Sequence, residues 1–300
     1  MQILHKTSPG GGQSCRTCRG VCGKFEDVKV SLITACFRSA KVIRTALESV
    51  LGQKDVEFEY LVVDGGSDDG TVAIIKEYEP KFGGRMRWLS ERDKGMYDAI
   101  NKGIRMATGD VVGILNADDV LADDRTLAQI ADAFSCGEGA SESRKPGDEW
   151  RVECVYADIR FVKGGNTVEE LRGANTVRYC SAAKWRPWMF RFAAMVPHPS
   201  LYVRKECFER LGCYSLDYRI CSDFELELRF LKIAGLKAAY LPKCVVVMRT
   251  GGASTAGWRA NVEINREDLK ALRANGVWSC LPMIYLKYLF KIWGFVFKKV

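Results

Sequence analysis

The stretch FEYLVVDGGSDDGT, residues 58–71, decides how this chain folds. Its first half, Phe58 to Val63, is a short apolar and β-branched run that predicts a buried strand. Its second half begins at Asp64 and consists of glycine, serine and aspartate, which favour turns. In an open parallel sheet, ligands bind just outside the carboxyl ends of the strands. The turn after Val63 is therefore a candidate ligand site.

The same pattern recurs on both sides of this stretch. Val28 to Cys36 predicts a preceding strand, and Val111 to Leu115 predicts a following one that ends in Asn116-Ala117-Asp118-Asp119. Apolar residues at helical spacing over 42–51 and 96–107 predict helices between the strands. Strands that alternate with helices indicate an α/β fold, with a mostly parallel central sheet and helices on both faces.

The second half of the chain has a mixed pattern. Val152 to Tyr156 and Ser200 to Val203 resemble strands, Phe224 to Ala234 resembles a helix, and Ser135 to Glu149 resembles a loop or insertion. We predict three parts: a flexible extension over 1–27, a catalytic domain over 28–280, and an amphipathic, basic and aromatic helix over 281–300.

The overall charge limits the classes of partner. The 300 residues include 45 lysines and arginines and 37 acidic residues, which gives a net charge of +8. This excess suits an anionic ligand or an anionic membrane surface. The sequence has no aromatic-and-basic recognition motif, so we expect no nucleic-acid partner.

The first residues bear on localisation. Met1 to Lys24 is polar and glycine-rich, without the apolar core of a signal peptide, so we expect a cytoplasmic protein with reduced thiols. Cys15, Cys18 and Cys22 form a C-x-x-C-x-x-x-C cluster. Zinc requires a fourth ligand, and no nearby residue supplies one at finger-like spacing. We interpret this segment as an extension with free thiols.

The acidic turns predict a metal site. Asp64 on its own is explained equally well as a residue of a ligand site and as a turn former or helix cap. Asp118 and Asp119 are adjacent carboxylates that repel each other, and a divalent cation relieves that repulsion. Oxygen ligands favour Mn²⁺ or Mg²⁺, and such an ion can bridge a diphosphate. No phosphate-binding glycine motif competes with this interpretation.

Four segments together resemble the family 2 glycosyltransferases, most closely the bacterial branch that builds surface polysaccharide and lipopolysaccharide. They are VSLITACFRSAKVIRTALESVLGQ (30–53), YLVVDGGSDDGT (60–71), ERDKGMYDAINKGIRMATGD (91–110) and VGILNADDV (112–120). The resemblance covers roughly residues 28–250. It implies an A-type fold with a Rossmann-like nucleotide-binding half and an acceptor half. It also implies a nucleoside-diphosphate-sugar donor, a divalent metal, inversion at the anomeric carbon, and a glycan or lipid-linked acceptor.

The resemblance also assigns residues to the donor. Asp64 matches the aspartate at the nucleotide base, Asp93 matches the one near the uracil and ribose, and Asn116 to Asp119 matches the D-x-D region. Asn116 replaces the first acid, which leaves open whether Asp118 or Asp119 is the main metal ligand. The implied donor residues are Thr34, Ala35, Cys36, Asp64, Gly66, Asp93, Lys94 and Asp118, and the implied metal ligands are Asp118 and Asp119.

The acceptor side has fewer candidates. Asp223 resembles the family's catalytic base, which takes a proton from the acceptor hydroxyl. It could instead be a helix N-cap, in which case Glu225 is the alternative base. His198 lies between two prolines and is either a substrate contact or a structural residue. Arg249 is a candidate contact to the diphosphate.

Two other classes of protein would have different features. A nucleotidylyltransferase would need a glycine-rich, arginine-containing loop after the first strand, and residues 36–40 contain no glycine. A nucleotide-sugar-binding protein without transfer activity would show no donor hydrolysis.

The tail predicts a membrane contact. In a helix over 281–300, Lys287, Lys291 and Lys298 form one stripe on an otherwise apolar surface, as in an interfacial anchor. We therefore expect peripheral attachment at the inner face of the plasma membrane. The alternative is a helix packed on the catalytic domain with its lysines in water.

Overall fold

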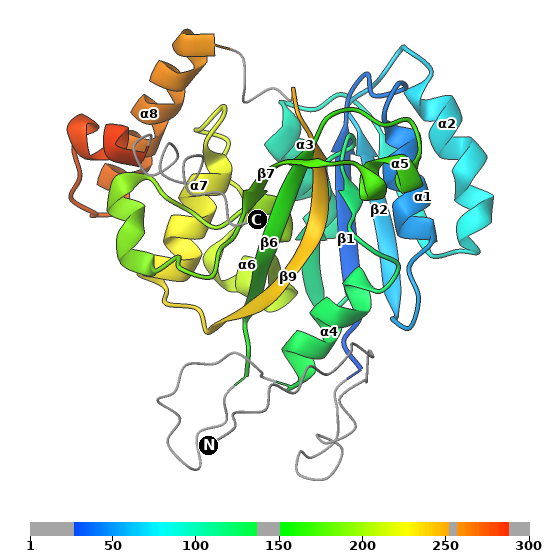
Figure 1. Ribbon diagram of the computed structural model, residues 1–300, viewed down its shortest axis with the longest axis horizontal. Helices are drawn as coiled ribbons and strands as arrows, with labels where there is room; N and C mark the ends of the chain where they lie inside the picture. The colour runs from blue at the N-terminus through cyan, green and yellow to red at the C-terminus, as the bar shows by residue number, and fades with distance from the viewer. Residues whose placement is uncertain (1–26, 137–150, 252–256, 288–300) are drawn as a thin grey trace, which may run out of the picture.

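The computed structural model describes residues 27–136, 151–251 and 257–287 (Figure 1). The cysteine cluster at 15–22, residues 137–150 of the predicted insertion, and the tail after Lys287 lie outside the described residues.

The described chain is built on one nine-stranded sheet with the order β3-β2-β1-β4-β8-β6-β9-β5, to which β7 adds beside β6. The strands β3, β2, β1 and β4 are parallel neighbours, which confirms the predicted parallel half. The other half is mixed, because β8 is antiparallel to β4 and β6, whereas β6 and β9 are parallel. The strands are β1 (Val30–Cys36), β2 (Phe58–Asp64), β3 (Met86–Ser90), β4 (Val111–Ile114), β5 (Val120–Leu121), β6 (Cys154–Val162), β7 (Thr176–Cys180), β8 (Tyr202–Arg204) and β9 (Ala238–Arg249).

Helices cover both faces of this sheet, as predicted. The α-helices are α1 (Ile43–Leu51), α2 (Thr71–Tyr78), α3 (Met96–Met106), α4 (Thr126–Cys136), α5 (Val168–Gly173), α6 (Lys205–Leu211), α7 (Ser222–Glu227) and α8 (Gly257–Ala274). The shorter turns are η2 (Glu79–Phe82), η3 (Pro187–Phe192), η4 (His198–Ser200) and the π-helical η5 (Leu228–Ile233). The predicted helix over 224–234 is thus an α-helix that continues as a π-helix.

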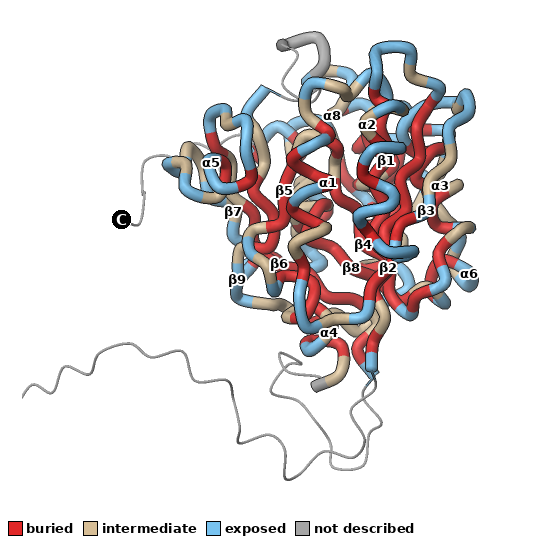
Figure 2. The backbone as a smooth tube through the Cα atoms, turned by 90° about the vertical axis from the view of Figure 1, so that its right-hand side faces the viewer, coloured by how far each residue is buried: buried red, intermediate tan, exposed pale blue. Residues whose placement is uncertain are grey.

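The strands divide the core into two layers, because successive side chains of a strand point to opposite faces. Leu32 belongs to the cluster that packs under α1, α2 and α4, whereas its neighbour Ile33 belongs to the cluster under α3, α7 and α8. Figure 2 shows the central strands buried along their length. Close packing explains Gly103 on α3, because a Cβ there would lie 2.5 Å from Ile33 Cγ2.

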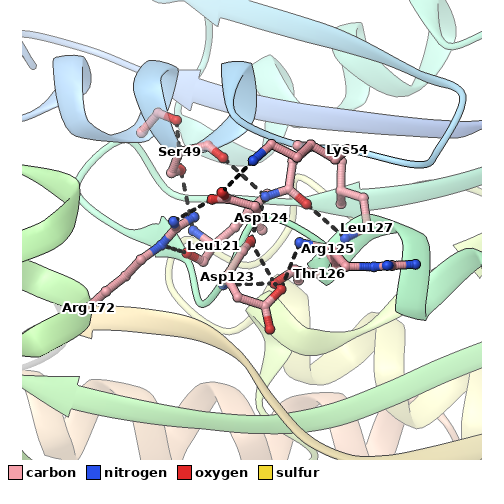
Figure 3. Close-up of polar contacts among 11 residues, drawn as sticks. Ser49, Lys54, Leu121, Asp123, Asp124, Arg125, Thr126, Leu127 and Arg172 are labelled. Atoms are coloured by element: carbon pink, nitrogen blue, oxygen red, sulfur yellow. Dashed lines mark hydrogen bonds and ion pairs between the residues drawn. The ribbon is translucent and has the colours of Figure 1, made fainter. Parts of the chain in front are cut away.

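A polar cluster fixes the chain just after Asp118 and Asp119 (Figure 3). Arg172 on α5 donates from Nη1 to Asp124 Oδ1 at 2.6 Å and from Nε to the carbonyl of Leu121 at 3.0 Å. Lys54, which follows α1, donates to the other oxygen of Asp124 at 3.2 Å. The cluster ties α1, α5 and the β5–α4 turn together, and so it supports the strand-end turn that precedes β5.

The start of the tail packs on the domain. Residues 281–287 are helical, and Ile284 is fully buried in the same cluster as α7 and α8. Lys287 donates to Asp268 on α8 at 2.7 Å, and both side chains are buried. The prediction that Lys287 lies on an open lysine stripe is therefore wrong, because its charge is paired inside the fold. Across the three described ranges, no helix has the length and apolar character needed to cross a membrane.

Candidate active site

The carboxyl ends of three adjacent parallel strands bring the acidic turns together. Cys36 at the end of β1 pairs in register with Asp64 at the end of β2. On the other side of β1, the main chain of Leu115 donates to the carbonyl of Ile33 at 2.9 Å, so the turn after β4 starts at the same edge. The sequence prediction that these turns share one edge is correct.

Asp64 is a structural residue of that edge. Its side chain is fully buried. Oδ2 accepts hydrogen bonds from the main chain of Gly66 at 3.0 Å, the main chain of Ser67 at 2.9 Å and the Ser90 hydroxyl at 2.7 Å. Oδ1 accepts the Ser67 hydroxyl at 2.5 Å. These bonds shape the loop that starts at Gly65, so the geometry assigns Asp64 to holding this loop rather than to touching a base directly.

The predicted base-flanking residues of β1 also face inward. Thr34 is buried, and its hydroxyl donates to the carbonyl of Leu115 at 2.8 Å. The Cys36 thiol is buried, and its sulfur lies 3.8 Å from Asp64 Oδ1. Its burial, and to a lesser extent the charge of Asp64, raise the pKa of the thiol, so the thiol stays protonated. Ala35 is half-buried. The side chains of Thr34 and Cys36 are therefore turned into the fold.

Asp93 and Phe37 pack against the backbone of Gly65 at the end of β2. A Cβ at position 65 would lie 2.7 Å from Asp93 Oδ2 and 3.4 Å from Phe37 Cδ2. Asp93 is half-buried, and its Oδ1 accepts the main chain of Gly95 at 2.9 Å. The Phe37 ring is 57% exposed. The side chain of Lys94 beside them is exposed.

Sequence reasoning missed Phe37. A large apolar residue that directly follows a buried strand, at the ligand-binding end of the sheet, was the available signal. An exposed ring beside a carboxylate and a bare glycine backbone is suited to stacking on a flat aromatic ligand.

The turn after β4 separates its two carboxylates. Asp119 is buried, its Oδ2 accepts the Asn116 amide at 2.8 Å, and its Oδ1 accepts the main chain of Arg249 at 3.3 Å. Burial, reinforced by the charge of Asp118, raises the pKa of Asp119 to about 8. Asp118 is half-exposed. Asp118 is therefore the carboxylate that is open to a ligand, and Asp119 is an internal residue of the turn.

Arg249 is half-buried beside the turn after β4. Its Nε donates to the carbonyl of Asp118 at 2.9 Å, its Nη2 donates to the Thr45 hydroxyl at 2.8 Å, and its Nη1 donates to the carbonyl of Gly165. All three nitrogens of the guanidinium are thus engaged within the protein. Arg249 therefore fixes the Asp118–Asp119 turn, and its contact to a diphosphate stays a prediction.

The carboxylates of this turn suit a divalent cation in an open site. Among the residues that the structure describes, no group of three or more His, Cys, Asp or Glu side chains is arranged to hold a metal. Mg²⁺-type sites commonly use one or two carboxylates and take their remaining ligands from phosphates and water. Asp118, next to the buried carboxyl of Asp119, fits that arrangement.

Asp223 lies in the first turn of α7 and lines a large cavity. Its Oδ1 lies 3.2 Å from the Tyr97 hydroxyl and accepts the main chain of Phe224 at 2.8 Å. The N-cap of α7 is Cys221, so the alternative of Asp223 as N-cap is wrong. Glu225 is buried, and both its oxygens pair with Arg229 at 2.9 and 3.0 Å, away from the cavity lining. The geometry favours Asp223 over Glu225 as the base.

His198 joins the same network through an aromatic pair. Its Nε2 lies 2.7 Å from the Tyr214 hydroxyl, and the Tyr214 ring stacks on Tyr97 with centroids 5.6 Å apart. Burial lowers the pKa of His198, so the ring is neutral at pH 7. His198 also lines the cavity with Asp223, which is compatible with the predicted substrate contact. The sequence analysis did not identify Tyr97 or Tyr214 as site residues.

Glu227 is a further buried acid that sequence reasoning missed. It is fully buried one turn after Asp223, and its Oε2 accepts the main chain of Val196 at 3.1 Å. Its Oε1 has no partner among the described residues. Burial, with the nearby charge of Asp223, raises the pKa of Glu227 well above its usual range. The fold therefore disfavours the ionised form of this carboxyl.

Comparisons of sequence identify the class of protein. The family model described as "Glycosyl transferase family 2" matches residues 31–145. An uncharacterized glycosyltransferase of Mycobacterium tuberculosis is 30% identical over 201 residues, which are 67% of this chain and 68% of that protein. A "PGL/p-HBAD biosynthesis glycosyltransferase" of Mycobacterium bovis is 29% identical over 81% of this chain and 83% of its own length. The chain belongs to the family 2 glycosyltransferases and is an enzyme of that class.

Solved structures share the fold. Residues 1–349 of Staphylococcus aureus TarS in complex with UDP match with a TM-score of 0.54 and 18% identity, over 81% of this chain and 65% of that one. The chain spans 39% of the longer TarS structure. A mannosyltransferase of Pyrobaculum calidifontis, in complex with GDP-Man and Mn²⁺, matches with a TM-score of 0.50 and 19% identity, over 89% of this chain and 80% of that one. These likenesses confirm the predicted α/β fold.

Proposed function

We propose that this glycosyltransferase transfers a sugar, with inversion, from a nucleoside-diphosphate sugar to an acceptor hydroxyl. The observation that carries the proposal is the path of residues 93–97. Asp93 lies against Gly65 at the end of β2, and Tyr97 lies 3.2 Å from Asp223. One short segment therefore connects the strand-end turn at Gly65 to the cavity that Asp223 lines.

The donor lies at the strand ends in this proposal. The base stacks on the exposed ring of Phe37, with Asp93 at its polar edge. The diphosphate extends toward Asp118, where a divalent cation is held by that carboxylate. When bound, such an ion offsets the negative charge that develops on the leaving diphosphate. The complexes of similar folds with UDP and with GDP-Man and Mn²⁺ support this placement.

Asp223 takes the role of base. It removes the proton of the acceptor hydroxyl as that oxygen attacks the anomeric carbon, while the bond from this carbon to the diphosphate breaks. The nucleoside diphosphate leaves on the opposite face of the sugar, which inverts the anomeric centre. The Tyr97 hydroxyl orients the carboxylate, and neutral His198 can accept or donate a hydrogen bond to the acceptor.

Nucleotide release tests the function directly. The full chain is incubated with UDP-, GDP- and dTDP-sugars, with Mn²⁺ or with EDTA, and the free diphosphate is measured. We expect slow donor hydrolysis with one donor class, lost in EDTA and in Asp118→Asn. The proposal fails if every donor stays intact and none shifts the melting temperature.

We also propose that the enzyme contacts a membrane surface near residue 280. Trp278 is 69% exposed, and the apolar side chains of Leu281, Tyr285 and Leu286 are also exposed. Exposed aromatic and aliphatic residues at one helix start favour insertion at a lipid interface. In vesicle co-sedimentation, the full chain should bind anionic vesicles and the variant Trp278→Ser/Leu281→Ser/Leu286→Ser should not. Equal sedimentation of both proteins would contradict the proposal.

A further inference from the structure

A cavity of about 960 Å³ opens beside Asp223 and His198. Its volume is that of a small-molecule site. Most of its lining is apolar and comes from β6, β7, the segment before η4, and α8. The side chains that matter here are Phe161, Val177, Trp185, Met195, Val196 and Ile264.

The two charges at one wall of this cavity cancel. Lys287 donates to Asp268 Oδ2 at 2.7 Å, and both residues line the cavity. A paired ammonium and carboxylate present little net charge to an occupant. The wall between α8 and the start of the tail is therefore nearly neutral.

The chemistry of the lining selects the occupant. The lining also includes Thr176, Arg178, Tyr179, Ser181 and Lys184. A sugar ring placed away from them, against the valine, isoleucine and methionine side chains, would leave hydroxyls without partners, and each unpaired buried hydroxyl is costly. An alkyl or aryl group placed there gains free energy in proportion to the apolar area that it buries.

We propose that the acceptor carries its reactive hydroxyl beside an apolar aglycone, an alkyl or aryl group, and that this aglycone lies in the cavity. The inference rests on the proposed function, because the cavity is continuous with Asp223 as the base. It favours an amphipathic acceptor over a free glycan chain.

Matched glycosides test the inference. Binding of methyl, octyl and phenyl β-D-glucopyranoside to the full chain is measured by calorimetry, below the concentration at which the octyl compound forms micelles. We expect the octyl and phenyl compounds to bind at least about tenfold more tightly than the methyl compound, because they bury more apolar area.

Serine variants locate the binding. Val177 and Ile264 line the cavity and are only half-buried, so Val177→Ser and Ile264→Ser should fold. Each should weaken octyl glucoside binding several-fold and leave UDP binding unchanged. Leu281→Ser is the matched control, because Leu281 is exposed and outside the cavity lining, and it should change neither.

The outcomes separate this inference from the proposed function. If donor hydrolysis occurs but all three glycosides bind equally, the aglycone site is overturned and the transferase proposal stands. If octyl glucoside binding is unaffected in both cavity variants but lost in Leu281→Ser, the aglycone binds the outer surface, and the inference is also overturned. If cavity binding is found without any donor hydrolysis, the apolar site stands and the transferase proposal fails.

Discussion

The hydroxyl of Tyr97 lies 3.2 Å from Oδ1 of Asp223, although 126 residues separate the two in sequence. The same hydroxyl lies 2.5 Å from the carbonyl of Ile220, at the entry to α7. Tyr97 also lies in the first turn of α3, directly after the loop that carries Asp93. The position of the proposed base is therefore coupled to the loop that packs against the end of β2.

Asp223→Asn should lower turnover by roughly 10²–10⁴-fold, the usual contribution of a general base. The amide keeps the size of the side chain but cannot take a proton at neutral pH. Donor affinity, measured by calorimetry with UDP and Mn²⁺, should hardly change, because Asp223 lies on the acceptor side.

Tyr97→Phe is the companion variant. It leaves the carboxylate in place and removes the hydroxyl that contacts both Asp223 and the carbonyl of Ile220, so a loss of about tenfold or less in turnover is expected. Turnover near wild type in Asp223→Asn would exclude Asp223 as the base.

Asp118→Asn and Asp119→Asn should differ. The half-exposed Asp118 is the proposed ligand, so its variant should lose Mn²⁺-dependent UDP binding while its melting temperature is kept. Asp119 is buried with a pKa raised to about 8, so a neutral asparagine resembles its metal-free state and should retain much of the binding. Calorimetry with and without EDTA measures both. A total loss confined to Asp119→Asn would reverse these two roles.

The sequence predicted the parallel half of the fold well because its signals are local. Buried strands and acidic turns follow one another within a few residues, and parallel pairing then places Cys36 beside Asp64 at one edge. It could not predict which carboxylates stay open to a ligand. The Asp64 carboxylate accepts a hydrogen bond from Ser90, which is 26 residues away in sequence. The Arg249 guanidinium donates one to Thr45, which is 204 residues away. Such contacts leave no periodic pattern in the chain.

Glu227→Gln should stabilise the protein at neutral and alkaline pH. The folded-state pKa of Glu227 is raised, so the fold disfavours the ionised carboxyl, whereas the unfolded chain ionises it above its ordinary pKa of 4.5. The cost of keeping it neutral is absent below pH 4.5 and grows as pH rises. Glutamine never incurs this cost, so the variant should gain on the order of 1–3 kcal/mol at pH 7.

Urea unfolding at pH 4.5, 7 and 8.5 measures this difference. Glu225→Gln is the contrasting variant, because it weakens the buried pair with Arg229 and should destabilise at all three pH values. A gain for Glu227→Gln that does not grow with pH would show that Glu227 is ionised in the fold.

Glu59→Gln should have the opposite pH dependence. The hydrogen bonds that Glu59 accepts from Ser31, Thr108 and Arg87 outweigh its burial and lower its pKa from 4.5 to about 2. The stabilisation is present above pH 4.5 and is lost as pH falls toward 2. The variant should lose about 2–3 kcal/mol at pH 7 and approach wild type near pH 2.

Urea unfolding across this range tests the expectation. Glu57→Gln is the control, because Glu57 is exposed and its closest cation, Lys29, lies 4.0 Å away, so little change is expected. A constant loss from pH 7 to pH 2 in Glu59→Gln would mean that packing, not charge, explains the effect.

Removal of the tail should destabilise the catalytic domain itself. A chain that ends at Cys280 exposes the site of Ile284 and leaves the buried Asp268 without Lys287. Breaking a buried ion pair from one side typically costs about 3–5 kcal/mol. Burial already raises the pKa of Asp268 despite the lysine, so its lone charge would be strongly disfavoured. We expect a fall in melting temperature of several degrees or more.

Asp268→Asn in the shortened chain separates charge from packing. It removes the unpaired carboxylate and should recover part of the lost stability, whereas the same substitution in the full chain removes the carboxylate that Lys287 contacts and should destabilise. This crossed response identifies the ion pair as the link between the tail and α8. If the shortened chain melts at the same temperature as the full chain, residues 281–287 contribute nothing to the fold, and any loss of vesicle binding on truncation would then come from an anchor alone.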